Sequence, residues 1–189
     1  MQIPVEKSSS IAIACLVLCV SGCGDPEPIT AKPTTACGTD GALVTEIYGG
    51  VRASIEWDAG VLECHGMPRP NGEGARLRFA GPATTADGER RLAFILGLPD
   101  LRRGETAQEL PTNVTLMEEG TGRFFGTRDA ANCWTDIEVH ERMQPTESTT
   151  YSVSGVLYCV APLAELNGKS NVSFADLTFT GHVTWGIPK

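Results

Sequence analysis

The chain has little positive charge and few histidines. Its 15 lysines and arginines stand against 23 aspartates and glutamates, so the formal net charge is −8, and it has only 3 histidines in 189 residues. Nucleic acids are held by basic surfaces, so this balance argues against nucleic acid as a partner. Three histidines are also too few for a histidine-rich metal site.

Motifs typical of several enzyme classes are missing as well. The chain has no G-x-S-x-G nucleophile elbow, no P-loop and no G-x-G-x-x-G fingerprint, and no two cysteines have C-x-x-C spacing. The lone G-x-G at residues 72–74 has no predicted strand before it and no helix after it, so it is interpreted as a turn. We therefore predict a protein that is not an enzyme and that uses no cofactor and no metal ion.

Long apolar runs are absent too. The uncharged segment 11–20, IAIACLVLCV, has ten residues, whereas a helix needs about 20 to span a bilayer. Its length is typical of the apolar region of a signal peptide, and Lys7 supplies a weak positive charge before it. Val20-Ser21-Gly22-Cys23 follows, with small residues ahead of a cysteine.

These residues resemble the lipobox of bacterial lipoproteins. The resemblance implies removal of residues 1–22, lipidation of Cys23 and acylation of the new N-terminus, which would attach the protein to the membrane of the cell envelope. Gly24 in place of aspartate implies sorting to the outer membrane, with the face left open. An ordinary signal peptide and an uncleaved apolar anchor are the alternatives.

The residues after Cys23 are typical of a tether. Segment 24–35 holds three prolines and three threonines with almost no apolar residues. We expect a flexible tether over 23–36 and one folded domain over 37–189, which is long enough to bury a sizeable core.

The cysteines predict a disulfide framework. Of the seven, two lie in the signal peptide and Cys23 would carry lipid, so four remain in the folded part: Cys37, Cys64, Cys133 and Cys159. An even number in an oxidising envelope predicts two disulfides. Segments 133–143 and 151–160 alternate as strands, and folding them about Thr146 places position 133 opposite 159. We therefore predict Cys133–Cys159 and, by elimination, Cys37–Cys64.

Short strand patterns recur along the folded part. We expect strands at residues 42–48, 51–57, 61–65, 75–80, 89–98, 113–118, 122–127, 133–143, 151–160 and 171–185, with 51–57 and 61–65 paired as a hairpin and short helical turns at 101–110 and 162–166. About nine or ten strands with frequent turns indicate an all-β fold, an antiparallel β-sandwich. The pattern leaves immunoglobulin-like and jelly-roll-like strand orders open.

One predicted strand face carries candidate chemistry. Trp134, Asp136, Glu138 and His140 are spaced by two, so they are expected on one exposed face. They would bind a ligand, either a divalent cation or a sugar ring stacked on the tryptophan, and Asp176 and His182 would join them if the last strand lies beside theirs. The alternative is an ordinary solvated sheet face.

A second group surrounds Cys64. Glu63 and His65 share a face, and Glu56 is expected on the partner strand, which suggests either an acid–base pair or a polar sheet edge.

Charge is unevenly distributed along the chain. Residues 69–103 carry seven arginines against four carboxylates, and residues 104–147 carry three arginines against nine. The arginine pairs 90/91 and 102/103 would bind an acidic partner or lipid headgroups, or pair internally with the acidic half, which we favour. Residues 98–104 are interpreted as a recognition loop.

The function favoured by these patterns is a lipid-anchored binding or accessory module that recognises an envelope protein or a glycan. The alternatives are a carboxylate- or metal-dependent hydrolase and a structural spacer without ligand. A shallow face centred on Trp134 would favour binding, a deep pocket with converging acids would favour the hydrolase, and a flat polar surface would favour the spacer.

Overall fold

The computed structural model describes residues 37–71, 73–128, 132–144 and 149–186, which form strands and connecting turns. The predicted signal peptide, Cys23 and the tether lie outside the described residues and stay predictions. The strands are β1 (Ala42–Gly49), β2 (Ala53–Asp58), β3 (Glu63–Pro68), β4 (Ala75–Thr85), β5 (Gly88–Leu98), β6 (Ala107–Pro111), β7 (Asn113–Glu118), β8 (Arg123–Gly126), β9 (Cys133–Arg142), β10 (Thr150–Cys159), β11 (Leu163–Glu165), β12 (Asn171–Phe174) and β13 (Leu177–Thr184).

The strands form one antiparallel sheet. Its order is β3-β4-β5-β7-β8-β11-β12-β1-β13-β10-β9-β6, and β2 pairs with β1. The all-β, antiparallel class is thus confirmed, although hydrogen bonding runs through a single sheet and the described residues hold 13 strands. One added strand arises because the predicted strand 171–185 is interrupted at Ala175 and Asp176.

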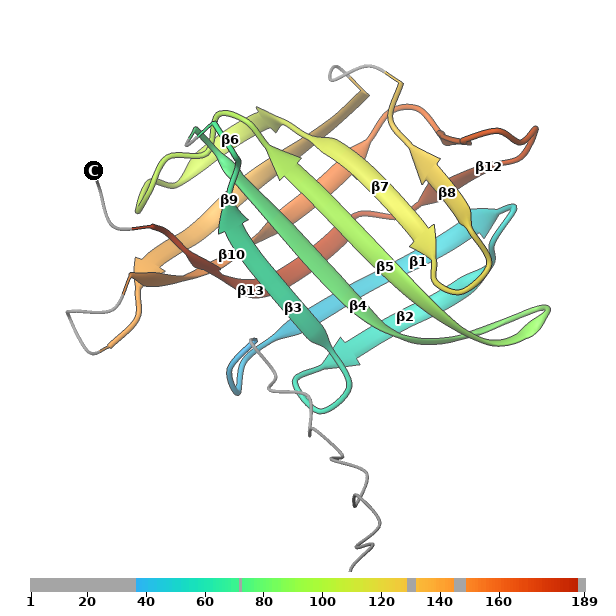
Figure 1. The fold of residues 1–189 in the computed structure, drawn as a ribbon, viewed down its shortest axis with the longest axis horizontal. Helices are drawn as coiled ribbons and strands as arrows, with labels where there is room; N and C mark the ends of the chain where they lie inside the picture. Colours follow the sequence, from blue (N-terminus) through green and yellow to red (C-terminus); the bar gives the residue numbers. More distant parts are fainter. Residues whose placement is uncertain (1–36, 72, 129–131, 145–148, 187–189) are drawn as a thin grey trace, which may run out of the picture. The chain divides into compact units, whose positions relative to one another are not determined.

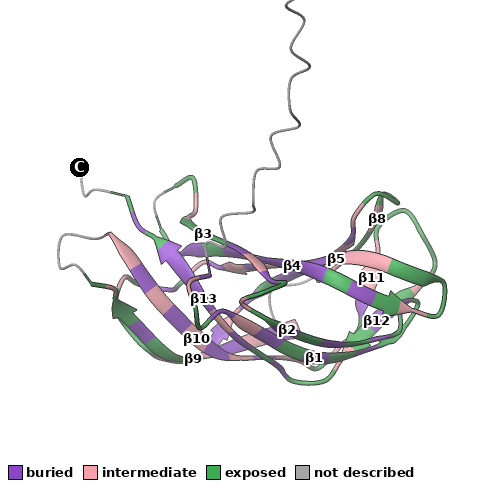
Figure 2. Ribbon diagram, turned by 90° about the horizontal axis from the view of Figure 1, so that it is seen from below, coloured by how far each residue is buried: buried purple, intermediate pink, exposed green. Residues whose placement is uncertain are grey.

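The sheet folds over itself so that its two halves face each other. Figures 1 and 2 show β3, β4, β5 and β7 over β1, β2, β13 and β10, with β8, β11 and β12 at the end where the halves join. Aromatic rings connect the halves, with Phe79 and Phe179 5.4 Å apart and Trp57 and Phe94 6.5 Å apart between ring centroids. Each large buried side chain contributes about 1.5–3 kcal/mol, so the fold rests on this shared apolar layer.

The hairpin predicted between 51–57 and 61–65 is wrong. β2 pairs with β1, and β3 pairs with β4. The carbonyl of Asp58 accepts hydrogen bonds from the N–H groups of Val61 and Leu62, and its side chain accepts one from Gly60 at 2.8 Å. This turn leads into Leu62, which is fully buried, so the chain crosses from one half of the sheet to the other instead of returning beside itself.

Both predicted helical turns are wrong as well. Residues 163–165 form β11, which pairs with β8 and β12, and residues 107–111 form β6, which pairs with β9. Pairing with a neighbouring strand overrides the weak local preference for a helical turn. No helix among the described residues is long and apolar enough to cross a membrane.

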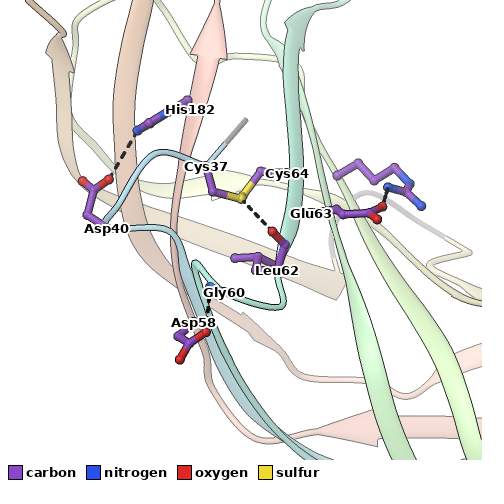
Figure 3. Close-up of a disulfide and its surroundings, with 9 residues drawn as sticks. Cys37, Asp40, Asp58, Gly60, Leu62, Glu63, Cys64 and His182 are labelled. Carbon is purple, nitrogen blue, oxygen red and sulfur yellow. Dashed lines mark hydrogen bonds and ion pairs between the residues drawn. A yellow bond between two sulfur atoms is a disulfide. The ribbon is translucent and has the colours of Figure 1, made fainter. Parts of the chain in front are cut away.

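Both predicted disulfides are confirmed. Cys133 and Cys159 face each other across β9 and β10 with their Cα atoms 4.0 Å apart. Cys37 is joined to Cys64 of β3, with a Cα–Cα distance of 5.2 Å, and Figure 3 shows this bridge beside Leu62. The first disulfide closes a hairpin, and the second holds residue 37 against the edge strand β3.

Candidate functional site

The predicted ligand face on β9 is divided by a β-bulge. Ile137 pairs with Gly155 and Val139 pairs with Ser154, so Glu138 is an extra residue on β9. A bulge reverses which side chains point inward. Val139 is accordingly 37% exposed and His140 only 2% exposed. The prediction that His140 shares a face with Trp134 is therefore wrong, while Trp134 and Asp136 point outward and Glu138 is exposed at the bulge.

Gly155 explains why the bulge forms at this position. A Cβ atom at residue 155 would lie 2.1 Å from the carbonyl oxygen of Asp136. Only glycine allows the two strands to approach this closely.

The exposed end of β9 and β10 carries two neighbouring aromatic rings. Trp134 lies directly opposite Tyr158, their ring centroids are 6.1 Å apart, and their planes differ by 27°. Both side chains are half-buried. Tyr158 was not among the residues predicted from the sequence, although the register that pairs Cys133 with Cys159 already places it beside Trp134. We call Trp134, Tyr158, Asp136 and Glu109 the Trp134 platform.

Carboxylates surround these rings. An oxygen of Asp136 accepts a hydrogen bond from the backbone N–H of Glu109 at 2.7 Å, and Glu109 has a φ of 52° where β6 shifts register. The pKa of Tyr158 is raised, first by desolvation and then by the negative charges of Asp136, Glu109 and Asp176. Within the described ranges, none of these three carboxylates forms an ion pair, so the platform is aromatic and negatively charged.

Of the two residues predicted to join the ligand face from the last strand, Asp176 acts on Tyr158 and His182 lies elsewhere. Strand β10 lies between β9 and β13, yet Asp176 is near enough to affect Tyr158. His182 is buried elsewhere, with Nε2 3.6 Å from a carboxylate oxygen of Asp40 (Figure 3). Across the part of the chain that is described, no three His, Cys, Asp or Glu side chains are grouped as metal ligands.

The residues around Cys64 do not form the suggested acid–base group. Glu63 is ion-paired with Arg78 and Arg91 on the outer face of the sheet. His65 is exposed opposite Arg78 of β4. Glu56 lies on β2, which pairs with β1 rather than with β3, so its predicted place on the partner strand is wrong.

The two arginine pairs have different surroundings. Arg90 binds Glu118 at 3.0 Å, and Arg91 binds Glu119 at 2.8 Å, so this pair joins the basic and acidic halves of the sequence as we favoured. Arg102 and Arg103 have no carboxylate partner among the residues that the structure describes. Segment 98–104, the predicted recognition loop, therefore presents two arginines that pair with no carboxylate of the described ranges.

A further ionic group lies where the halves of the sheet join. Arg123 of β8 binds Glu118 at 3.2 Å and Glu165 of β11 at 2.8 Å. The hydrogen bond from Arg123 is the main cause that lowers the pKa of Glu165, and the same hydrogen bond raises the pKa of Arg123. These pairs link neighbouring strands, and we assign them a structural role.

The opposite end of the β9–β10 hairpin holds a buried aromatic cluster, which sequence reasoning also missed. The indole N–H of Trp185 donates to Nε2 of His140 at 3.2 Å, and Nδ1 of His140 lies 3.1 Å from the carbonyl oxygen of Glu105. Indole is only a donor, so His140 is neutral and carries its proton on Nδ1. Burial is the main cause that lowers the pKa of His140.

A cleft of about 950 Å³ opens beside this cluster. Its walls come from the loop between β3 and β4 and from residues 99–103, and Trp185 and Gly186 also line it. It contains part of the predicted recognition loop, including Arg102 and Arg103. The molecule thus offers two candidate sites, the open Trp134 platform and this cleft.

Comparisons of the chain with protein-family models, with curated proteins and with solved structures found no match.

Proposed function

We propose that the protein is a non-catalytic binding module of the cell envelope, anchored through lipid on Cys23 at the outer membrane, and that it holds a glycan against the Trp134 platform. The lipobox resemblance supports the anchor, and two disulfides fit an oxidising compartment. In this proposal the folded sheet serves as a sandwich-like support for the platform.

The observation that carries the proposal is the pair of half-exposed rings beside carboxylates that form no ion pair with any described residue. Aromatic faces pack against the C–H surfaces of sugar rings, and their amphipathic character suits a partly wet site. Ionised carboxylates only accept hydrogen bonds, which matches the hydroxyl donors of a sugar. Asp136 is held by the backbone of Glu109, so one acceptor is already fixed before a ligand arrives.

The shape of the platform favours binding over hydrolysis. Its side chains project from strands β6, β9 and β10 of one sheet face, whereas a hydrolase would bring two carboxylates together around a bond. The cleft beside Trp185 is lined by arginines and prolines with two carboxylates, Glu73 and Asp100, both of which are exposed.

Tryptophan fluorescence of the full chain, titrated with a panel of soluble polysaccharides, tests the glycan proposal. Trp57 and Trp185 are buried and Trp134 is half-buried, so a bound sugar should shift mainly the Trp134 emission. Trp134→Ala and Tyr158→Ala should weaken binding about tenfold or more. Binding of the variants is measured by calorimetry, because Trp134→Ala lacks the reporting indole. Tyr48→Ala is the matched control, because Tyr48 is 53% exposed on β1, outside the platform. Equal loss in all three variants would contradict the proposal.

The anchor has its own test. Cys23→Ala should release the protein from the membrane fraction into the soluble fraction, because the thiol that would accept diacylglycerol is gone. Retention of the variant in membranes would exclude the lipoprotein interpretation without affecting the glycan test.

A further inference from the structure

The cleft beside Trp185 is built by two loops that touch. Arg69 N–H donates to the carbonyl of Gly74 at 3.2 Å and closes the first loop, and Leu101 N–H donates to the carbonyl of Leu98 in the second. Gly74 has a φ of 70°, and a Cβ there would lie 2.2 Å from the carbonyl oxygen of Leu98. Glycine thus allows the loops to meet, and the volume of about 950 Å³ falls at the upper end of the usual range for ligand pockets.

Three arginines line this cleft. Arg69, Arg102 and Arg103 form no ion pair within the described ranges, whereas Arg78, Arg90, Arg91 and Arg123 elsewhere each bind a carboxylate. A guanidinium presents N–H donors in a planar fork that matches a carboxylate. The cleft therefore has unused capacity to bind an oxyanion.

Arg103 is already held in place for this role. Its guanidinium donates to the carbonyl oxygen of Gly186 and lies 5.9 Å from the ring centroids of both Tyr151 and Trp185. A side chain fixed by such contacts loses less entropy when it binds a ligand. None of these contacts neutralises its charge.

The other lining residues define the class of ligand. Asp100 and Glu73 are exposed at the cleft and would repel a polyanion such as a nucleic acid or a multiply phosphorylated ligand. Pro99 is half-buried and adds apolar surface beside the arginines, while Trp185 lines the cleft at 6% exposure. The combination suits a ligand with one carboxylate next to an apolar group.

We propose that this cleft binds a short peptide through its free C-terminal carboxylate, with Arg102 and Arg103 holding the carboxylate and Pro99 contacting the last side chain. The site is separate from the Trp134 platform, and the proposal does not depend on the glycan proposal.

The test uses N-acetylated tripeptides that end in alanine, leucine or phenylalanine, each prepared as the free acid and as the C-terminal amide. Binding to the full chain is measured by calorimetry, and the indole N–H signal of Trp185 is followed by NMR. The acids should bind and shift that signal, and the amides should bind at least about tenfold more weakly. Arg102→Ala and Arg103→Ala should each cost about tenfold or more, and Arg103→Lys should lose part of the affinity because it keeps the charge but not the fork.

Matched variants make the result decisive. Arg76→Ala removes an exposed arginine of β4 that does not line the cleft and should leave peptide binding unchanged, as should Trp134→Ala. Equal binding of acids and amides, equal loss in Arg76→Ala, or no binding of any acid below about 1 mM would overturn the proposal. So would binding of inorganic phosphate that depends on the same arginines while the peptides fail to bind.

Discussion

The two ends of the β9–β10 hairpin carry similar residues but place them in opposite environments. At the disulfide end, Trp134 and Tyr158 are half-exposed and face carboxylates. At the loop end, His140 and Tyr151 are buried beside Trp185 and face Arg103 and Arg142. The bulge at Glu138 separates the ends, because His140 points inward after it whereas Trp134 and Asp136 point outward before it. One inserted residue thus gives a single strand an open anionic surface at one end and a buried, neutral histidine at the other.

The largest expected effect comes from opening the disulfide end. Cys133→Ser and Cys159→Ser should each lower the free energy of unfolding by about 2–5 kcal/mol, because the loop that the bond closes becomes free in the unfolded chain. The double variant should be no less stable than either single variant, since both remove the same bond. Urea denaturation of the three variants measures this, and additive losses would argue against the pairing.

Crowding the bulge with a larger side chain should have the next largest effect on stability. Gly155→Ala places a Cβ against the carbonyl of Asp136 and should cost about 1–3 kcal/mol of stability through overpacking. Gly97→Ala is the control, because a Cβ there would meet its nearest neighbour at an ordinary 3.5 Å, and it should change stability by about 0.5 kcal/mol or less. Urea denaturation compares the two. Similar losses would show that the bulge does not need glycine at this position.

The loop end should show a loss of stability as the pH falls below neutral. Because burial lowers the pKa of His140, the folded state binds fewer protons at this residue than the unfolded chain does. Stability should therefore be full above the unfolded histidine pKa of about 6.5 and decline as the pH falls below it. His140→Gln keeps a hydrogen-bond donor and an acceptor but does not titrate, so its stability should decline less at low pH. Urea denaturation between about pH 7.5 and 5, which spans the titration of histidine, measures this difference. An unchanged slope would exclude His140 as its source.

The smallest effect is expected at the platform. Asp136→Ala should change stability by about 0.5 kcal/mol or less, because the side chain is partly solvated and makes one hydrogen bond at the surface. It should also lower the pKa of Tyr158, since it removes one of the negative charges that raise it. Ultraviolet titration of the Tyr158 phenol measures this change in pKa. Trp134→Ala removes no charge, so it should not lower the pKa of Tyr158 by the electrostatic effect that Asp136→Ala has. A Tyr158 pKa that stays unchanged in Asp136→Ala would place the carboxylate too far away to act on a ligand held there.

The difference between the two ends of the hairpin also explains which features could be predicted from the sequence and which could not. Strict alternation predicted the strands, the all-β class and the Cys133–Cys159 register, because sheet geometry has a period of two. It failed at His140, where one bulge shifts the period. Gly155 is the signal that was available, since a glycine inside a strand often marks a bulge. The cleft could not be predicted from the sequence, because its walls come from loops whose positions depend on how the sheet folds over.

The disulfide between Cys37 and Cys64 has a mechanical consequence. A force applied to the chain before Cys37 reaches β3 through a covalent bond, in addition to the backbone that leads into β1. Strand β1 lies inside the sheet, paired with β2 on one side and with β12 and β13 on the other. Tension would therefore be shared between both halves of the folded sheet, and the hydrogen bonds of β1 would not have to bear it one after another.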